Sequence, residues 1–519
     1  MSEINSFRLR WPIEDVIGYA RRYAMTHGLL CLVPNNLDQA MIVPFSLYPS
    51  PYSFEHFQSI WSIQTAYNRL YQKISLDDAA LEKALSPVLP LDDFVARLWT
   101  IHRRIPCHQP IQLDIYRSKL MIFLENLFVN NFFSDDYMLD TKVNQMRQIE
   151  FNTISSAFAG LTAVVGQLHQ AVLRYALDRC SIHHLKIDEK YQSNSSSSSI
   201  DFLFPNEALK KSAEAMCKAF DLYGNHEACL LFLVTPQERN ICDQNALISA
   251  IHQQCPSLPI YLKTFQQLTL ELIYDEKTSK IFLKSTNEEI ALVYFRAGYI
   301  PDHYIDESCW NVREIIEKSL AIKCPTIRSQ LAGCKIVQEY LTRPGIVEKY
   351  VAEMEFVTKI RSTFAQMFTF DDQNMREHYR NILRENPHHY VLKPQREGGG
   401  NNKYDEELLN IIENQQEILN NFIGMEKIFP STCRSSLIKS SGENLLNVEC
   451  INEIGIYGTM LSNTTTNEQY LNEVTGYLVR TKTIGTNEGG VATGYSVLDC
   501  LNFADNGHVL ANIFVPKSF

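Results

Sequence analysis

The chain has 519 residues, and 48 basic against 59 acidic side chains give it a formal net charge of −11. An acidic balance of this size excludes a simple binder of nucleic acid or anionic membrane, although a local basic cleft could still take phosphates. Hydrophobic residues make up 45% and charged residues 21% of the chain, which excludes global disorder and predicts a globular protein with a large packed core.

The sequence also favours a cytoplasmic protein without a membrane partner. Its first residues contain no apolar signal region, and no apolar run approaches the length of a membrane span. The 13 cysteines are scattered without a CxxC pair, which favours reduced thiols over a disulfide framework. A secreted protein would follow only if an upstream leader had been removed.

The first segment, residues 1–205, is predicted to be helix-rich. A periodic stretch after Pro12 predicts a helix over 13–27 that stops before Gly28, and further helical patterns cover roughly 54–104. The apolar run 120–133 is predicted to be a packed helix rather than a membrane contact. The serine-rich tract 193–199 is predicted to form a surface loop or linker.

The hydrophobic pattern of the sequence changes from about residue 226. Short apolar runs at 228–235 and 289–298 are separated by helical segments, a pattern typical of parallel strands in an α/β layer, so 206–335 is predicted to be an α/β domain. Residues 336–519 carry two glycine-rich stretches, EGGGNN at 397–402 and EGGVATG at 488–494. These predict a glycine-rich lid.

The most informative segment is HYVLKPQREGGGNNKY, residues 389–404. An apolar strand ends in Lys393, and three glycines then allow the backbone to approach a ligand closely, as phosphate oxygens require. Neither GxxxxGK[ST] nor GxGxxG is present, so the segment supports neither a Walker A loop nor a dinucleotide fingerprint. The alternative interpretation is a surface turn.

Other segments suggest a metal site, an anion site and a site for adenine. In QIEFNTISSAF, strand alternation puts Glu150 and Asn152 on one face, two hard oxygen donors that suit Mg²⁺, although an ordinary solvated strand is the alternative. In VRTKTIG, Arg480 and Lys482 alternate onto one face beside a glycine-rich flap and suit an anion; a solvated edge strand would explain them as well. FIGMEKIFP could form an adenine slot.

Together these segments resemble the eukaryotic-type glutathione synthetase family of the ATP-grasp superfamily, over roughly residues 10–515. The matching motifs are VLKPQREGGGNN, QIEFNTIS, ERNICDQ, YFRAGYIP, QLAGCK, MEKI, RTK and EGGVATG. The resemblance implies an α/β ATP-grasp fold and ATP-dependent ligation of γ-glutamylcysteine to glycine through an acyl phosphate. It also implies that 206–335 is the substrate-binding domain, that Mg²⁺ is bound as a pair of ions, and that the protein is a homodimer.

The resemblance further implies roles for individual residues. Mg²⁺ would be held by Glu150, Asn152 and Glu397, and the catalytic cations would be Lys335, Lys393 and Arg480. The nucleotide would be bound by Glu150, Lys335, Lys393, Gly398, Gly399, Asn402, Tyr404, Met425, Glu426, Lys427, Ile428, Glu453, Lys482 and Glu488. γ-Glutamylcysteine would be bound by Arg117, Ser155, Glu238, Asn240, Gln244, Arg296 and Tyr299, and glycine by Arg480, Val491 and Ala492.

The sequence departs from the family pattern in the dipeptide half of the site, the residues that would bind γ-glutamylcysteine. Lys119 stands where the family's RSDYM motif has its acid, Ala157 replaces a serine, and an apparent insertion follows residue 121. Two alternatives therefore stay open: a paralogue that keeps the nucleotide site but serves as a binding or interaction protein, secreted if a leader was removed, and a ligase for another amine such as β-alanine or serine. The flap at Val491 and Ala492 would decide the second.

Overall fold

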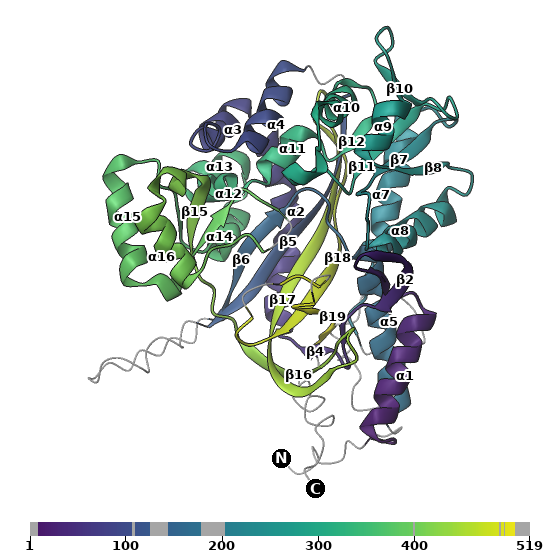
Figure 1. Ribbon diagram of the computed structural model, residues 1–519, viewed down its shortest axis with the longest axis vertical. Coiled ribbons are helices and arrows are strands. Elements are labelled where there is room, and N and C mark those ends of the chain that lie inside the picture. Colours follow the sequence, from purple (N-terminus) through teal and green to yellow (C-terminus); the bar gives the residue numbers. More distant parts are fainter. Residues whose placement is uncertain are drawn as a thin grey trace.

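The structure is a computed structural model that describes residues 9–105, 109–124, 144–177, 203–397, 400–486, 489–491 and 494–503 (Figure 1). A seven-stranded sheet crosses the middle of the molecule in the order β16-β3-β19-β18-β17-β5-β6. Its strands are β3 (Phe45–Ser46), β5 (Ile111–Leu124), β6 (Asn144–Asn152), β16 (Thr432–Ile438), β17 (Asn444–Asn463), β18 (Glu468–Thr483) and β19 (Val497–Asp499). Strands from the predicted first and third segments share this sheet, and the division at residues 205 and 335 stays a prediction.

The predicted helix over 120–133 is wrong for residues 120–124, which form the end of β5. Leu120 and Met121 are buried in the sheet. A continuous apolar run fits a strand covered on both faces as well as it fits a buried helix, so the period of the sequence could not separate them. Residues 125–133 and the serine-rich tract 193–199 lie outside the described residues.

The predicted N-terminal helices are confirmed. α1 (Ile13–Thr26) ends before Gly28, whose φ of +75° suits glycine, and α2 (Phe54–Ser75), α3 (Asp78–Leu85) and α4 (Asp93–Arg104) occupy the second helical stretch. The side chains of Ser53, Asp77 and Asp92 each accept a hydrogen bond from a first-turn N–H of the helix that follows. Such N-caps explain where these helices begin.

Smaller strands and one long helix complete this part of the fold. β1 (Leu30–Val33) pairs with β2 (Asn36–Ile42), and β4 (Ser50–Pro51) pairs with β20 (Leu501–Asn502). Helix α5 (Ala159–Ala176) packs against α1 and against β18 and β19 of the central sheet. None of the described helices combines the length and the apolar character needed to cross a bilayer.

The predicted parallel-strand region is present. β7 (Cys229–Leu233), β8 (Ile260–Lys263), β11 (Ile290–Phe295) and β12 (Ile322–Cys324) form a parallel sheet in the order β12-β11-β7-β8. Every residue of β7 and β11 is buried, as expected for strands covered on both faces. The remaining elements here are α7 (Ala208–Tyr223), α8 (Ile241–Gln254), α9 (Phe265–Glu271), α10 (Glu307–Lys318), β9 (Leu272–Asp275) and β10 (Lys280–Leu283).

A third unit lies on the left in Figure 1 and has its own core. The small antiparallel sheet β13-β15-β14 packs with two helices, and Phe368, Leu383, Leu392 and Leu408 are buried between them. Its elements are β13 (Met367–Phe368), α15 (Gln373–Glu385), β14 (Tyr390–Pro394), α16 (Asp405–Asn414) and β15 (Phe422–Glu426). The helices α11 (Ile327–Ala332), α12 (Lys335–Thr342), α13 (Ile346–Tyr350) and α14 (Met354–Thr363) lead to it.

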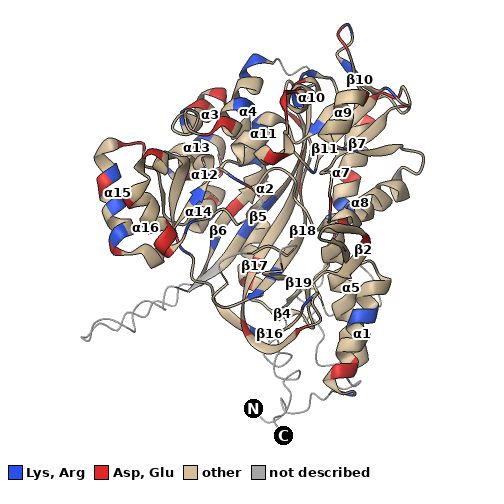
Figure 2. Ribbon diagram, in the orientation of Figure 1, with Lys and Arg blue, Asp and Glu red and all other residues tan. Residues whose placement is uncertain are grey.

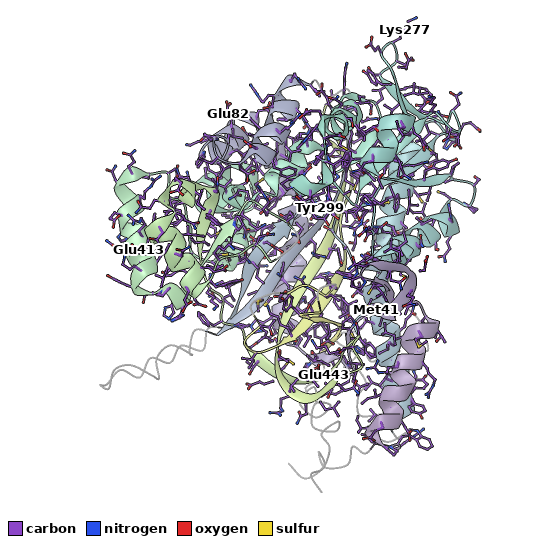
Figure 3. All side chains as sticks on the ribbon, viewed as in Figure 1. Met41, Glu82, Lys277, Tyr299, Glu413 and Glu443 are labelled. Carbon is purple, nitrogen blue, oxygen red and sulfur yellow. The ribbon has the colours of Figure 1, made fainter. Side chains whose placement is uncertain are left out.

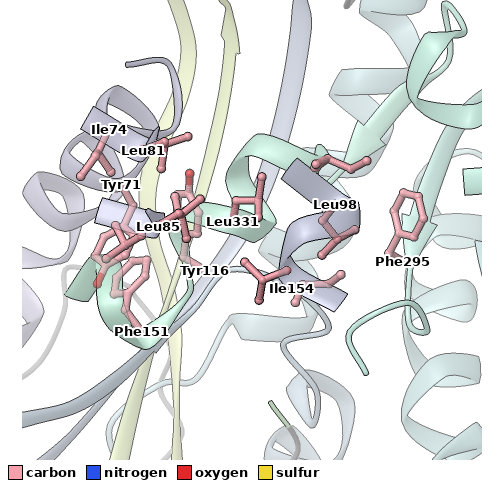
Figure 4. Packing of buried hydrophobic residues seen from close by; sticks show 14 of the residues in the cluster. Tyr71, Ile74, Leu81, Leu85, Leu98, Tyr116, Phe151, Ile154, Phe295 and Leu331 are labelled. Atoms are coloured by element: carbon pink, nitrogen blue, oxygen red, sulfur yellow. The ribbon is translucent and has the colours of Figure 1, made fainter. Parts of the chain in front are cut away.

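The largest hydrophobic core explains how β6 presents its polar residues (Figure 4). Phe151 of β6 stacks on Tyr71 of α2, with ring centroids 3.8 Å apart. Because side chains alternate along a strand, Glu150 and Asn152, on either side of Phe151, must point to the opposite face. The core therefore fixes which way the predicted metal donors face.

Candidate active site

A cavity of about 980 Å³ opens on the face of the central sheet opposite this core. Its wall is completed by β14, β15 and the loops that follow β7 and β11 of the parallel sheet. Tyr299, on the loop after β11, lies near the middle of the molecule in Figure 3 and lines this cavity. The volume is at the upper end of the range for small-molecule sites and leaves room for more than one ligand.

Charged and polar side chains on four neighbouring strands form the floor of the cavity. Residues two apart on a strand share a face, and residues directly opposite on antiparallel strands do so as well. Lys119 lies opposite Glu150, and Glu453 lies opposite Arg480. The charged and polar residues of these strands that line the cavity are Arg117 and Lys119 on β5, Glu150 and Asn152 on β6, Glu449 and Glu453 on β17, and Arg480 and Lys482 on β18.

A cluster around Lys335 contains both predicted metal carboxylates. The Lys335 ammonium donates to the backbone carbonyl of Arg396 at 2.7 Å. It also lies 3.3 Å from Glu397 Oε1 and 4.0 Å from Glu150 Oε2. The two carboxylates, far apart in the sequence, therefore already face one cation.

Asn152 joins this cluster to the other half of the cavity. Its Nδ2 donates to Glu397 Oε2 at 3.0 Å, and its Oδ1 accepts a hydrogen bond from Arg117 at 3.0 Å. Arg117 also donates to the backbone carbonyl of Ala157, at 3.0 Å. The predicted metal strand and the predicted dipeptide residues thus meet through one amide.

The charges of this cluster depend on its burial. Burial alone would raise the pKa of Glu150, but Lys119, Lys335 and Lys393 hold it well below its usual range. The pKa of Glu397 is raised, because its burial outweighs the attraction of Lys335. Burial opposes the charge of Lys335, yet Glu397 and Glu150 raise its pKa. Glu150 is therefore ionised and Lys335 protonated at neutral pH.

Lys393 is the most deeply buried cation of the site. Its ammonium, in a residue 3% exposed, donates to the backbone carbonyl of Ile149 at 2.7 Å and lies 3.5 Å from Met425 Sδ. Burial lowers its pKa to about 7, against the opposing attraction of Glu150. An anion bound beside Lys393 would restore its full charge, so the site favours anions at this point.

Glu453 gathers three cations on the cavity floor. Its Oε1 lies 3.0 Å from Lys482 Nζ, and its Oε2 lies 2.9 Å from Arg480 and 3.3 Å from Lys119. Burial would raise its pKa, but the three cations hold it well below the usual range. Gly489 of the flap passes so close that a Cβ there would lie 2.8 Å from Glu453 Oε2. A larger residue at position 489 would therefore have to displace the Glu453 carboxylate.

The cavity is basic although the protein is acidic. Its described lining residues include ten Lys and Arg side chains against six carboxylates. On the outer helix α15, by contrast, both signs appear in Figure 2, and Arg380 and Arg384 pair with nearby glutamates. A pocket with a surplus of cations attracts polyanions.

The predicted adenine slot lies at the end of β15. Met425 is buried, and Tyr404, Lys427 and Ile428 line the same part of the cavity, with Lys427 Nζ 5.5 Å from the centre of the Tyr404 ring. The backbone N–H groups of Glu426 and Lys427 already donate to Gln366 and His389. Other backbone groups of this segment would therefore have to form the hydrogen bonds to the edge of an adenine base.

The predicted dipeptide residues form a second polar cluster. Glu238 accepts hydrogen bonds from the backbone N–H of Asn240 and from Gln244 Nε2, both at 2.7 Å. Among the described residues, a guanidinium nitrogen of Arg296 and the amide oxygen of Asn240 are buried without a hydrogen-bond partner. Buried polar atoms are costly when unpaired, so these two are suited to a polar ligand.

The sequence did not predict the role of Asp243. Its carboxylate accepts hydrogen bonds from the backbone N–H groups of Phe158 at 2.7 Å and Gly160 at 2.8 Å, at the start of α5. It therefore ties α8 to the loop that carries Ser155, whose φ is +55°. Its position in ERNICDQ, between two predicted residues, was a usable signal.

Most predicted site residues lie around this one cavity. Those that line it are Arg117, Glu150, Asn152, Ser155, Glu238, Asn240, Arg296, Tyr299, Lys335, Lys393, Glu397, Asn402, Tyr404, Met425, Glu426, Lys427, Ile428, Glu453, Arg480, Lys482 and Val491. Gln244 lies behind Glu238 in a small adjoining cavity. Gly398, Gly399, Glu488 and Ala492 lie outside the described residues. The cavity also contains cations that were not predicted as site residues: Lys119, Arg239 and Arg396.

The donor set fits a magnesium ion. Carboxylate and amide oxygens are the ligands that Mg²⁺ prefers, completed by water and phosphate oxygens. The contacts of Lys335 show that Glu150 and Glu397 can face a common cation. No group of three or more His, Cys, Asp or Glu suited to a metal occurs in the described part of the chain. Asn152, which here donates through Nδ2 to Glu397, would have to turn its amide oxygen towards the ion, and ligand oxygens would supply the other positions.

Known proteins are similar to this chain over nearly its whole length. The profile described as eukaryotic glutathione synthase, ATP binding domain, matches residues 12–503. Chloroplastic glutathione synthetase of Arabidopsis thaliana is 34% identical over 468 residues, 89% of this chain and 78% of that protein. Glutathione synthetase of Xenopus laevis is 32% identical over 499 residues, 94% of this chain and 96% of that protein.

A solved structure supports the same fold. A glutathione synthetase-like effector from Globodera pallida, in its apo form, matches with a TM-score of 0.71 at 21% identity, covering 94% of this chain and 96% of that one. The fold, the basic cavity and these relatives define an ATP-dependent ligase. The chain belongs to the eukaryotic glutathione synthase family. The family resemblance, the mixed α/β fold class and the ligase activity expected from the sequence are thereby confirmed.

Proposed function

We propose that this protein is a glutathione synthetase that joins γ-glutamylcysteine to glycine at the expense of ATP. The dipeptide carboxylate attacks the γ-phosphate of ATP and forms an acyl phosphate with release of ADP. The glycine amine then attacks the acyl carbon, and inorganic phosphate leaves. Activation is required because a carboxylate oxygen is a poor leaving group, whereas phosphate leaves readily.

One observation carries the proposal. Asn152 contacts Glu397 of the nucleotide half and Arg117 of the dipeptide half at 3.0 Å each. The two halves therefore meet at one point on the cavity floor, where a carboxylate held by Arg117 would lie beside a phosphate held by the cluster of Lys335. Such proximity is the main contribution a protein makes to phosphoryl transfer.

The nucleotide half neutralises phosphate charge. Lys335 and Lys393 contact the phosphates, and Lys482 joins them from the cavity floor. Glu150, Asn152 and Glu397 would hold Mg²⁺, which would offset the negative charge of the phosphates. Asn402 and Tyr404 close over the nucleotide, together with Gly398, Gly399 and Glu488, and Met425 and Ile428 flank the base.

The dipeptide half recognises charged termini. Arg117 and Arg296 bind carboxylates, and Glu238, held by Asn240 and Gln244, binds the ammonium group of the γ-glutamyl residue. Tyr299 and Ser155 complete this half. Arg480, with Val491 and Ala492 of the flap, receives the glycine carboxylate.

The proposal is tested with purified protein, ATP and Mg²⁺. Phosphate release is measured with both amino-acid substrates and with γ-glutamylcysteine or glycine omitted in turn, and the thiol tripeptide is identified by mass spectrometry. We expect turnover only with the complete mixture. Turnover that does not require both substrates, or that yields no tripeptide, refutes the proposal.

The two alternatives make different predictions. A paralogue that only binds nucleotide would bind ATP but release no phosphate in the complete mixture; the relatives that span nearly the whole chain favour synthesis. A ligase for β-alanine or serine would turn over faster with those amines than with glycine, and the flap at Val491 and Ala492 would set the preference. The homodimer, the Mg²⁺ pair and the cytoplasmic location stay predictions.

A further inference from the structure

Lys119 occupies a position in the cavity that the reaction above does not use. It lies on β5 opposite Glu150 of β6 and opposite Gly455 of β17. A Cβ at Gly455 would lie 2.9 Å from Arg117 Cδ, which shows how crowded this part of the floor is. The Lys119 side chain is 14% exposed and lines the cavity.

The contacts of Lys119 are looser than those of its neighbours. Its Nζ lies 3.3 Å from Glu453 and 3.8 Å from Glu150, whereas Arg480 and Lys482 approach Glu453 to 2.9 and 3.0 Å. Charge-assisted hydrogen bonds are normally about 2.7–2.9 Å long. A lysine ammonium has three N–H donors, so contacts of this length leave it able to bind a further acceptor.

The local charges favour an anionic acceptor. Five ammonium or guanidinium groups, those of Lys119, Lys335, Lys393, Arg480 and Lys482, surround the three carboxylates of Glu150, Glu397 and Glu453. One carboxylate, that of Glu453, is shared by three of these cations. This excess of positive charge, buried on the cavity floor, is best compensated by a ligand with several negative charges.

We infer that Lys119 is an additional phosphate-binding residue of the nucleotide site, held in place by Glu453 and Glu150 until the nucleotide arrives. The inference rests on the proposed function only in taking ATP as the ligand. Lys119 lies between Glu150, a proposed metal ligand, and Lys482, a proposed phosphate contact. A phosphate chain bound by those two groups would therefore pass within reach of its ammonium.

The test compares ligands that differ only in their phosphates. Binding of ATP, ADP and adenosine is measured by titration calorimetry, with and without Mg²⁺, for the wild-type protein and Lys119→Met. We expect Lys119→Met to raise the dissociation constants of ATP and ADP about tenfold and to leave that of adenosine unchanged within about twofold. Lys119→Arg, which keeps the charge, should bind ATP nearly as well as the wild type.

Lys211→Met is the matched control. Lys211 also forms an ion pair with a residue of the central sheet, Glu473 of β18 at 2.7 Å, but does not line the cavity. Its loss should leave the affinity for all three ligands unchanged. Thermal unfolding of each variant identifies a folding defect, and if Lys119→Met does not fold, Lys119→Gln replaces it.

Two results would overturn the inference. Unchanged ATP affinity would show that Lys119 serves only as a counter-ion for Glu453 and Glu150. An equal loss of adenosine binding would show a structural role. Both measurements omit the amino-acid substrates, so failure of the wild-type protein to form glutathione would refute the proposed function without deciding the role of Lys119.

Discussion

Acid is expected to destabilise the loop that carries Tyr299, through a single histidine. His303 Nδ1 accepts a hydrogen bond from the backbone N–H of Gly298 at 2.8 Å, and its ring meets that of Tyr299 edge to face with centroids 4.7 Å apart. Gly298 has a φ of +93° and its carbonyl accepts from Gln330 at 2.8 Å, so the loop is held from two sides. A protonated His303 could not accept the bond from Gly298.

The size of the effect follows from the shift in pKa. Burial lowers the pKa of His303 from 6.5 to about 4. Because the folded pKa is the lower one, the unfolded chain takes up the proton first as the pH falls. The free energy of unfolding therefore decreases from about pH 6.5 down to about pH 4, by about 3 kcal/mol in total. Roughly 2 kcal/mol of this is lost between pH 7 and pH 5.

The assay is urea unfolding at pH 7 and pH 5 of the wild type and of His303→Asn. The asparagine oxygen can accept the same hydrogen bond but does not titrate, so the variant should lose about 2 kcal/mol less than the wild type over this interval. Affinity for γ-glutamylcysteine should follow the same trend, because Tyr299 is a proposed contact. His226→Asn, at an exposed position, should behave like the wild type. Equal losses for His303→Asn and the wild type would refute the reasoning.

Three further predictions concern single side chains. Lys393→Ala and Glu397→Ala should each reduce phosphate release at least about tenfold, since both remove stabilisation of phosphoryl charge; near-normal rates would contradict the assigned site. Gly424→Ala should lower the free energy of unfolding by about 1–3 kcal/mol, because the Cβ of the new alanine would lie 2.2 Å from the Phe368 ring. Thermal unfolding measures the effect, and an unchanged melting temperature would show that the ring moves freely. Cys334→Ser should keep turnover within about twofold, because burial raises the pKa of this thiol to about 12 and keeps it neutral; an inactive but folded variant would reveal a missed role.

The sequence was most informative where local alternation decides which way a side chain points. Glu150 and Asn152 share a face because they are two residues apart on a strand, and the same rule places Arg480 and Lys482. Both pairs line the cavity. The phosphate-binding role of the glycine-rich loop after Lys393 stays a prediction, because Gly398 and Gly399 lie outside the described residues.

The sequence could not predict contacts that depend on which strands pair with one another. Alternation alone puts Lys119 on the same face as Arg117, but only the pairing of β5 with β6 and β17 brings it to Glu150 and Glu453. The same holds for Asp243, whose partners at the start of α5 are about 80 residues away. The strand at 120–124 was mistaken for a helix because its apolar run has no period that separates the two.

The central sheet is built from strands that lie far apart in the chain, and this determines when the ligand site can form during translation. Arg117 pairs with Tyr457, and Lys119 with Gly455, so the cavity floor joins strands more than 300 residues apart. Contacts of such separation form late, since the entropy of closing the loop must be overcome first. The parallel sheet, made within residues 229–324, can assemble while translation continues, but the ligand site cannot exist until the ribosome has released almost the entire polypeptide. Nascent chains that terminate early would therefore be inert towards nucleotide, whatever part of them has folded.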